Sequence, residues 1–181
     1  VTVKRKAKPR SRMPELGLDS IPEPMQRPRG ELWRCGLVGV GGMGIGLATQ
    51  IMVRAGHNEG YRVLFVDTKG MAIRNGGTVS QVTFTTASGP LTAVIPHGKA
   101  DLLIGVDVLE AARALDPAGR VRFASPQRTA AVINTDKIDT VTGLMGGVSF
   151  RVEELERLIR AYTRAEDGLT RDLSRLSEKY L

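Results

Sequence analysis

From residue 31 onward, short apolar runs alternate with stretches whose apolar positions recur at helical spacing. Continuous or alternating apolar runs predict strands, whereas spacing by three and four residues predicts helices. The predicted strands cover residues 32–40, 62–66, 79–85, 101–106, 121–124 and 130–134, and the predicted helices cover 43–58 and 109–115. This alternation favours an α/β fold, namely a Rossmann-like, doubly wound and mostly parallel sheet with helices on both faces.

The two ends of the chain differ in pattern from this central part. Residues 1–30 are rich in proline and basic residues and show no periodicity, which predicts an extended arm or linker. Residues 31–145 contain the alternating elements and form the predicted Rossmann-like domain. Residues 146–181 form the third predicted unit, in which helical spacing over 152–162 and 169–180 indicates two docking helices. Because the second of these is still in register at residue 181, we expect the natural polypeptide to continue.

The net charge of +7 raises the question of a nucleic-acid partner. Much of the positive charge lies in the arm, where six cations precede the first acid: Lys4, Arg5, Lys6, Lys8, Arg10 and Arg12. Such a run is typical of a solvated tail. Aromatic residues make up only 4% of the chain, too few for a base-stacking surface. We therefore expect no nucleic-acid partner.

Membrane and metal sites are not expected either. No apolar stretch approaches the roughly 20 residues of a membrane-spanning helix, and no signal peptide is evident, which favours a cytoplasmic protein. Cys35 is the single cysteine and lies in a predicted buried strand, so a structural thiol is expected. The two histidines, His57 and His97, lie far apart and match no metal-ligand spacing. The sequence therefore predicts no metal site in this chain.

The first predicted strand leads directly into a glycine-rich turn, LVGVGGMGIG, at residues 37–46. Gly39, Gly41 and Gly44 fit the pattern G-x-G-x-x-G, which allows a tight turn and close approach of the backbone to a ligand. The first N–H groups of the following helix have no intrahelical acceptor, and such groups bind phosphate. We therefore expect an anion to bind at the backbone of Gly41, Gly42, Met43 and Gly44.

A second glycine-rich loop follows the second predicted strand. Asp67 ends that strand, at the position where dinucleotide-binding domains carry an acid that binds ribose. The following residues, 68–80, contain the cations Lys69 and Arg74, and Asn75 lies beside them. Ligands of open α/β sheets bind in the crevice at the carboxyl ends of the strands. We therefore expect Lys69, Arg74 and Asn75 to face the same anion as the first turn.

Three segments in series resemble one known family. They are GVGGMGIG at 39–46, DTKGMAIRNGGTVSQV at 67–82 and IPHGKADLLIGVDVLEAARAL at 95–115. Together they resemble the gamma domain, or gamma subunit, of the 2-oxoacid:ferredoxin oxidoreductases, and in particular the indolepyruvate-type enzymes, including forms in which this domain is part of a fused chain. Lys69 stands where that family commonly has histidine, so a fixed cation replaces a titratable ring.

The resemblance implies a component of an enzyme that decarboxylates a 2-oxoacid on thiamine diphosphate, passes electrons through 4Fe-4S clusters to ferredoxin, and releases an acyl-CoA. A chain with one cysteine cannot supply the four ligands of such a cluster, so these cofactors are expected on partner subunits or segments. Coenzyme A, through its phosphates, is the candidate ligand of this domain. The implied assembly is a hetero-oligomer or a dimer of fused chains. This chain alone is expected to be inactive, and no catalytic residue is assigned to it.

Two other functions remain open at this point. The glycine turn with Asp67 as a ribose ligand also fits an NAD-dependent dehydrogenase, although about 45 residues after Asn134 leave little room for a substrate domain. Alternatively, the glycine-rich loops only pack against a neighbour, and the chain is a structural assembly module.

Overall fold

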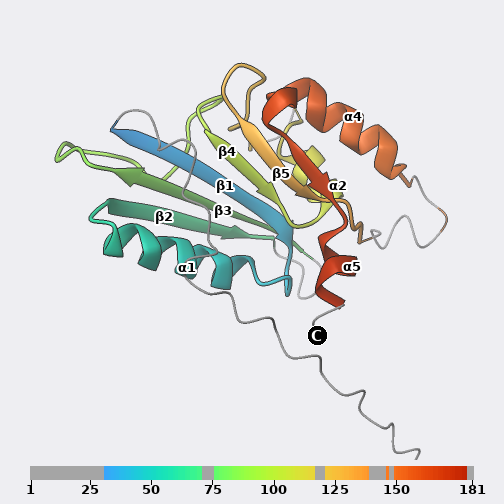
Figure 1. Ribbon diagram of the computed structural model, residues 1–181, viewed down its shortest axis with the longest axis horizontal. Helices are drawn as coiled ribbons and strands as arrows, with labels where there is room; N and C mark the ends of the chain where they lie inside the picture. The colour runs from blue at the N-terminus through green and yellow to red at the C-terminus, as the bar shows by residue number, and fades with distance from the viewer. Residues whose placement is uncertain (1–30, 71–75, 117–120, 139–145, 147–148, 179–181) are drawn as a thin grey trace, which may run out of the picture.

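The computed structural model describes residues 31–70, 76–116, 121–138, 146 and 149–178 (Figure 1). Its first elements are β1 (Leu32–Val40), α1 (Ile45–Asn58), β2 (Arg62–Lys69), β3 (Gly77–Thr85), β4 (Leu102–Gly105) and α2 (Val108–Arg113). They are followed by β5 (Ala130–Asn134), α4 (Val152–Tyr162), the 3-10 helix η2 (Ala165–Asp167), β6 (Leu169–Arg171) and α5 (Leu173–Glu178). The predicted alternation of strands and helices is confirmed.

The strands form one six-stranded sheet in the order β2-β3-β1-β4-β5-β6. β1 and β4, β4 and β5, and β5 and β6 pair in parallel, whereas β3 is antiparallel to both of its neighbours, β1 and β2. Since β1 and β2 both oppose β3, they run in the same direction. The carboxyl ends of every strand except β3 therefore lie at one edge of the sheet. The mixed, mostly parallel α/β sheet agrees with the predicted fold class.

Successive residues of β1 point to opposite faces, and each face packs against a different set of helices. Cys35 and Leu37 are buried in a cluster with Ile45 of α1. Val38 points the other way and packs in a second cluster, which contains buried residues of both α2 and α4, among them Val108 and Leu155. Helices consequently cover both faces of the sheet, as predicted, and Figure 1 shows α1 on the opposite side from α4.

The predicted strand over residues 121–124 is wrong. This segment runs beside the sheet, and its backbone accepts hydrogen bonds from the loop before β4: Ala100 N donates to Phe123 O over 2.8 Å. Its apolar character reflects packing, because the Phe123 ring lies over Gly36 of β1. A Cβ atom built on Gly36 would lie 2.3 Å from that ring, so only glycine fits beneath it.

The second C-terminal helix begins later than predicted. Leu169 and Leu173 have helical spacing, but Leu169 lies in β6, which pairs with β5 and covers the edge of the sheet. Burying edge N–H and C=O groups in a ladder outweighs the helical preference of a short segment. Helix α5 starts only at Leu173, whose N–H donates to Oδ1 of Asn134 over 2.8 Å. The first predicted docking helix is present as α4 and packs against α2.

Candidate anion-binding site

The turn between β1 and α1 leaves the start of the helix open. Gly42 and Gly44 have φ values of 98° and 82°, in the left-handed region that favours glycine. Gly44 is the N-cap residue of α1, and no side chain caps this end of the helix. The first N–H groups of a helix lack intrahelical acceptors and carry its positive partial charge. The turn therefore leaves backbone donors without a side-chain partner at the start of α1.

Two of the four predicted donor residues already use their amides in backbone hydrogen bonds, one to the loop before β3 and one within the turn. Gly41 N donates to Gly76 O over 2.9 Å, and Met43 N donates to Val40 O over 3.2 Å. The Met43 side chain also folds back, and its Sδ atom accepts from Val40 N at 3.4 Å. Gly42 N and Gly44 N have no acceptor among the described residues. The free donors at this site are thus the amides of Gly42, Gly44 and the first turn of α1.

β2 brings charged side chains to the same place. It extends past the predicted end to Lys69, so Lys69 lies on a strand and pairs with Thr78 of β3. Asp67 and Lys69 are two residues apart and therefore share the face of β2 that looks toward α1. Together with the turn they line a cleft of about 370 Å³, whose residues are Val40, Gly41, Gly42, Gly44, Ile45, Gly46, Asp67, Lys69 and Thr78.

The structure thus brings Gly41, Gly42 and Gly44 together with Lys69, as predicted for one anion site. Met43, the other predicted residue of the turn, is not among the residues that line the cleft. Arg74 and Asn75 lie outside the described residues. Among the described residues, the cleft holds one cation, Lys69, and one carboxylate, Asp67, next to the uncapped start of α1.

The Asp67 carboxylate is tied to α1 by two hydroxyl groups that sequence analysis missed. Ser80 of β3 donates to Asp67 Oδ1 over 2.5 Å, and its oxygen lies 2.7 Å from Thr49 Oγ1 of α1. Thr49 and Ser80 are 1% and 0% exposed, so the chain of hydroxyls runs through the core to the exposed acid. The sequence does contain a signal for the burial of Ser80. Because side chains alternate along β3, Ser80 lies on the same face as Val82 and Phe84.

The strand order places Asp67 one strand farther from β1 than the ribose-binding acid of dinucleotide-binding domains. In dinucleotide-binding domains the strand that carries the ribose-binding acid is the direct neighbour of the first strand. Here β3 lies between β1 and β2. Neighbouring strands are about 4.8 Å apart, so Asp67 is about 10 Å from β1 in the plane of the sheet.

Two acidic residues, Asp107 and Glu110, lie on the opposite face of the sheet, around α2. Asp107 is fully buried at the N-cap of α2, where Oδ1 accepts from Glu110 N and Oδ2 accepts from Ile138 N, each over 2.8 Å. Burial raises the pKa of Glu110, and the ion pair with Arg113 opposes that shift only in part. Glu110 fills the space beside Gly77, because a Cβ atom there would lie 2.5 Å from Glu110 Oε2. Asp107 caps α2, and both acids lie outside the cleft.

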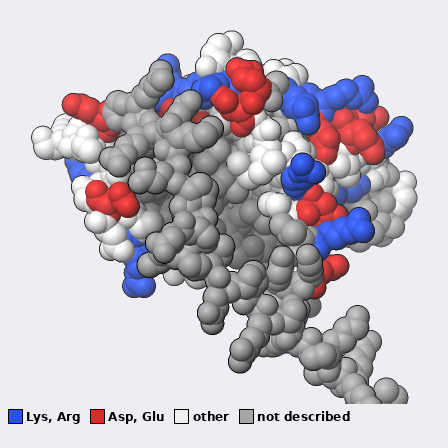
Figure 2. All heavy atoms as spheres, in the orientation of Figure 1, with Lys and Arg blue, Asp and Glu red and all other residues white. Residues whose placement is uncertain are grey.

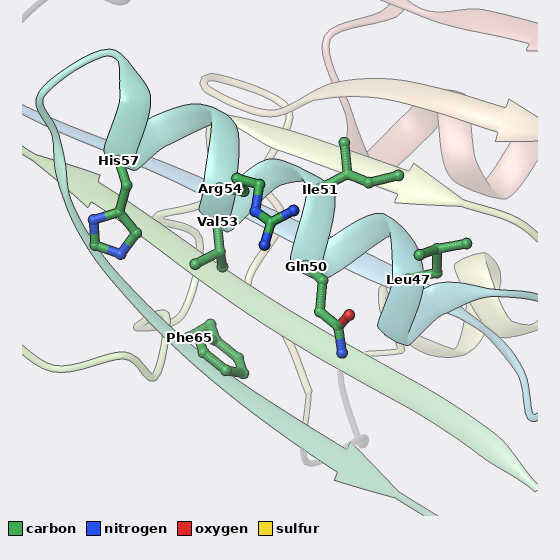
Figure 3. Close-up of a pocket in the computed structure, with 7 residues that line it drawn as sticks. All are labelled: Leu47, Gln50, Ile51, Val53, Arg54, His57 and Phe65. Atoms are coloured by element: carbon green, nitrogen blue, oxygen red, sulfur yellow. The ribbon is translucent and has the colours of Figure 1, made fainter.

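A larger groove of about 560 Å³ runs along α1 and β2 (Figure 3). It is lined by Leu47, Gln50, Ile51, Val53, Arg54, His57 and Phe65. Leu47 and Ile51 are 64% and 60% exposed, so α1 presents apolar side chains to solvent as well as to the sheet. Phe65 precedes Asp67 on the same face of β2, which places the groove next to the anion cleft.

Other site chemistry is sparse in the part of the chain that the structure describes. No group of three or more His, Cys, Asp or Glu side chains there has the arrangement of a metal site. Burial, with a smaller effect of the Asp101 carboxylate, raises the pKa of the Cys35 thiol, so Cys35 is a buried structural residue.

Among the described helices, none is both long and apolar enough to cross a bilayer. Basic and acidic side chains are interspersed along the rim in Figure 2.

A mixed α/β sheet with an open glycine turn at its carboxyl edge defines a Rossmann-like domain. Comparison with known proteins is more specific, because residues 34–163 match the family model described as pyruvate ferredoxin/flavodoxin oxidoreductase. The chain therefore belongs to the pyruvate ferredoxin/flavodoxin oxidoreductase family, and the resemblance found in its three motifs is confirmed.

Two curated relatives are subunits of indolepyruvate oxidoreductase. The chain is 36% identical over 104 residues to subunit IorB of Archaeoglobus fulgidus, which covers 56% of this chain and 46% of the relative. It is 34% identical over 77 residues to subunit IorB of Thermococcus kodakarensis, covering 42% and 37% of the two chains. The chain thus spans less than half the length of these relatives.

A solved structure shares the fold. It is a 2-oxoglutarate:ferredoxin oxidoreductase from Magnetococcus marinus with 2-oxoglutarate, coenzyme A and succinyl-CoA bound. The TM-score is 0.51 at 15% identity, and the alignment covers 83% of this chain but only 21% of that one. The same fold therefore occurs there as a small part of a much longer polypeptide.

Proposed function

We propose that this chain is the gamma component of an indolepyruvate-type 2-oxoacid:ferredoxin oxidoreductase. The whole enzyme would oxidatively decarboxylate a 2-oxoacid with thiamine diphosphate, form an acyl-CoA, and pass the electrons through 4Fe-4S clusters to ferredoxin. Family membership and the likeness to two IorB subunits support this proposal. Thiamine diphosphate and the clusters belong to partner subunits or segments, and this chain alone is inactive.

Within that enzyme, the cleft at the start of α1 would bind the phosphates of coenzyme A. The observation that carries this assignment is the uncapped N-terminus of α1, which faces the same cleft as Lys69. Free amides at Gly42 and Gly44 suit the several oxygens of a phosphate, and Lys69 adds a point charge. When bound, coenzyme A supplies the thiol that accepts the acyl group. The residues of this chain only hold and orient its phosphates.

The NAD-dependent alternative is weaker for a topological reason. It requires Asp67 to reach a ribose that is attached to phosphates held at the glycine turn. Because β3 separates β2 from β1, Asp67 is about one strand spacing farther away than that arrangement allows. Titration of the full chain with NADH tests this point, since a binding-induced fluorescence change would revive the dehydrogenase hypothesis.

The function of the whole enzyme is tested on the purified oxidoreductase complex. Indolepyruvate should be decarboxylated with reduction of ferredoxin in the presence of coenzyme A, and removal of thiamine diphosphate should abolish the reaction. A complex that contains this chain but binds neither thiamine diphosphate nor iron would overturn the proposal. Pyruvate and 2-oxoglutarate, tested side by side with indolepyruvate, identify the preferred 2-oxoacid.

A separate variant tests the coenzyme A site. Lys69→Gln should raise the KM for coenzyme A about tenfold, the effect of losing one charged contact, and leave the KM for the 2-oxoacid unchanged. Lys99→Gln, an exposed lysine on the loop before β4, is the matched control and should change neither value. If Lys69→Gln reduces assembly and not coenzyme A binding, the cleft is a packing surface, as in the structural alternative.

A further inference from the structure

Two arginines share one carboxylate at the amino end of the sheet, far from the cleft. Asp101, just before β4, accepts the backbone N–H of Arg34 at Oδ2 over 2.8 Å. The other oxygen, Oδ1, lies 2.7 Å from Nη2 of Arg128, which precedes β5. Asp101 N in turn donates to Arg34 O over 2.8 Å. The Asp101 carboxylate is therefore committed to a backbone amide and to Arg128, and the Arg34 guanidinium has no acceptor among the described residues.

This corner contains a group of polar atoms that lack partners. In the part of the chain that the structure describes, three buried side-chain nitrogen or oxygen atoms make no hydrogen bond: Arg34 Nε, Arg128 Nε and Thr83 Oγ1. Thr83 is fully buried and lies directly opposite Arg34 in the β1–β3 register, so both side chains point to the same face. Asp101 links Arg128 to the backbone of Arg34. Buried polar groups are nearly always satisfied, so these three atoms require an explanation.

The charges around Arg34, Arg128 and Asp101 also favour the binding of an additional negatively charged group. Two guanidinium groups face one carboxylate, which leaves an excess positive charge. Desolvation, followed by the charge of Arg128, lowers the pKa of Arg34, and Asp101 offsets these effects only in part. A second negative charge at this point would relieve both the repulsion and the unmet hydrogen bonds.

We propose that Arg34, Arg128 and Thr83 form a carboxylate-binding site at the amino end of the sheet. All three unpaired atoms can donate a hydrogen bond, so the missing group must accept several. A water molecule has two lone pairs and can accept from at most two of them, whereas a carboxylate offers about four lone-pair positions on two oxygens. Planar guanidinium groups match a carboxylate in shape. The side chain of Arg128 is 40% exposed, so the site lies next to the surface of the protein.

The site is separate from the anion cleft and does not depend on the proposed function. Arg34 lies near the start of β1 and the cleft begins at Val40, its last residue. Six residues of strand span about 20 Å, so one ligand group cannot occupy both places.

Acetate is a suitable probe of the full ¹⁵N-labelled chain. Added at constant ionic strength against chloride, it should shift the Nε–H resonances of Arg34 and Arg128 with one common, saturating curve. Arg54, an exposed residue of α1, provides an internal reference, and its Nε–H resonance should show no saturating shift.

Three variants test the residues of the site. Arg128→Gln should weaken the apparent affinity for acetate at least tenfold and Thr83→Val about tenfold, while Arg54→Gln leaves it unchanged. Thr83→Val preserves shape, so it keeps the test valid if Arg128→Gln unfolds the chain. Absence of saturation in the wild type overturns the proposal.

The assembled oxidoreductase distinguishes two sources of the carboxylate. If an acidic side chain of a neighbouring polypeptide supplies it, Arg128→Gln should weaken assembly about tenfold at low salt, and acetate should compete with assembly. If a free carboxylate is the ligand, assembly should be unaffected while the acetate titration still saturates. Either result supports the site, whereas a wild-type chain that shows neither effect excludes it.

Discussion

The hydroxyl of Ser80 donates a hydrogen bond to the carboxylate of Asp67 over 2.5 Å. It connects a fully buried residue of β3 to an exposed acid that lines the anion cleft. Thr49 of α1 continues the connection on the other side, 2.7 Å from Ser80. The Asp67 carboxylate is therefore connected through Ser80 to the packing of α1 on the sheet.

Removing this connection should destabilise the fold. Ser80→Ala deletes the donor to Asp67 and the acceptor of Thr49 in a buried place, so we expect a loss of about 1–3 kcal/mol in the free energy of unfolding. Urea denaturation measures the change. Ser177→Ala removes an exposed hydroxyl at the end of α5 and serves as the control. Equal effects of the two substitutions would show that the buried hydroxyl chain adds no stability.

Two glycines of the turn should respond to alanine with opposite signs. A Cβ atom at either Gly44 or Gly46 meets no other atom within 4 Å, so steric clashes do not enter. Gly44 has φ 82°, where an L-residue costs about 1–2 kcal/mol. Gly46 lies inside α1, where alanine is favoured over glycine by about 0.5–1 kcal/mol. Thermal unfolding should therefore show a lower midpoint for Gly44→Ala and a higher one for Gly46→Ala. A rise with both substitutions would contradict the left-handed conformation of Gly44.

The features that sequence analysis predicted correctly are those that depend on local pattern. The apolar run before the glycines gives β1, the spacing after them gives α1, and the short buried run at 101–106 gives β4. The glycine turn and Lys69 meet because parallel strands bring their carboxyl ends to one edge, a rule that needs no knowledge of side-chain packing.

The features that it missed depend on contacts between distant parts of the chain. Phe123 belongs to an apolar run of strand length, and only its position above Gly36 explains why this run is not a strand. Leu169 joins a strand because β5 offers an open edge, which spacing within 169–180 cannot reveal. The insertion of β3 between β1 and β2 likewise depends on pairing across the sheet, and it alters the role available to Asp67.

Glu110 should make stability depend on pH. Burial raises its pKa in the folded state, so ionisation costs stability once the pH exceeds the unfolded pKa, for which the ordinary value is 4.5. This cost grows as the pH rises to the folded pKa and is then constant, and it vanishes below the unfolded value. Glu110→Gln removes the titration. Its stability relative to the wild type should therefore increase between pH 4 and pH 7.

Denaturation curves at several pH values measure this difference. Glu153→Gln, which removes an exposed carboxylate of α4, is the control. The contrary result is that Glu110→Gln loses stability relative to the wild type as the pH rises. That result would mean that the ion pair with Arg113 outweighs the desolvation of Glu110, and that folding lowers the pKa of Glu110.

Asp67 and Lys69 should act in opposite directions on the binding of a phosphate-bearing ligand. Both line the cleft at the start of α1, one repelling and the other attracting an anion. Asp67→Asn removes the repulsion and retains an acceptor for Ser80, so we expect coenzyme A to bind the oxidoreductase about two- to fivefold more tightly at low ionic strength. Isothermal titration at two salt concentrations checks this, because the gain should shrink as salt screens the exposed carboxylate. If Asp67→Asn instead weakens binding at both salt concentrations, Asp67 makes a direct hydrogen bond to the ligand, and the cleft binds a hydroxyl-bearing group such as ribose in addition to phosphate.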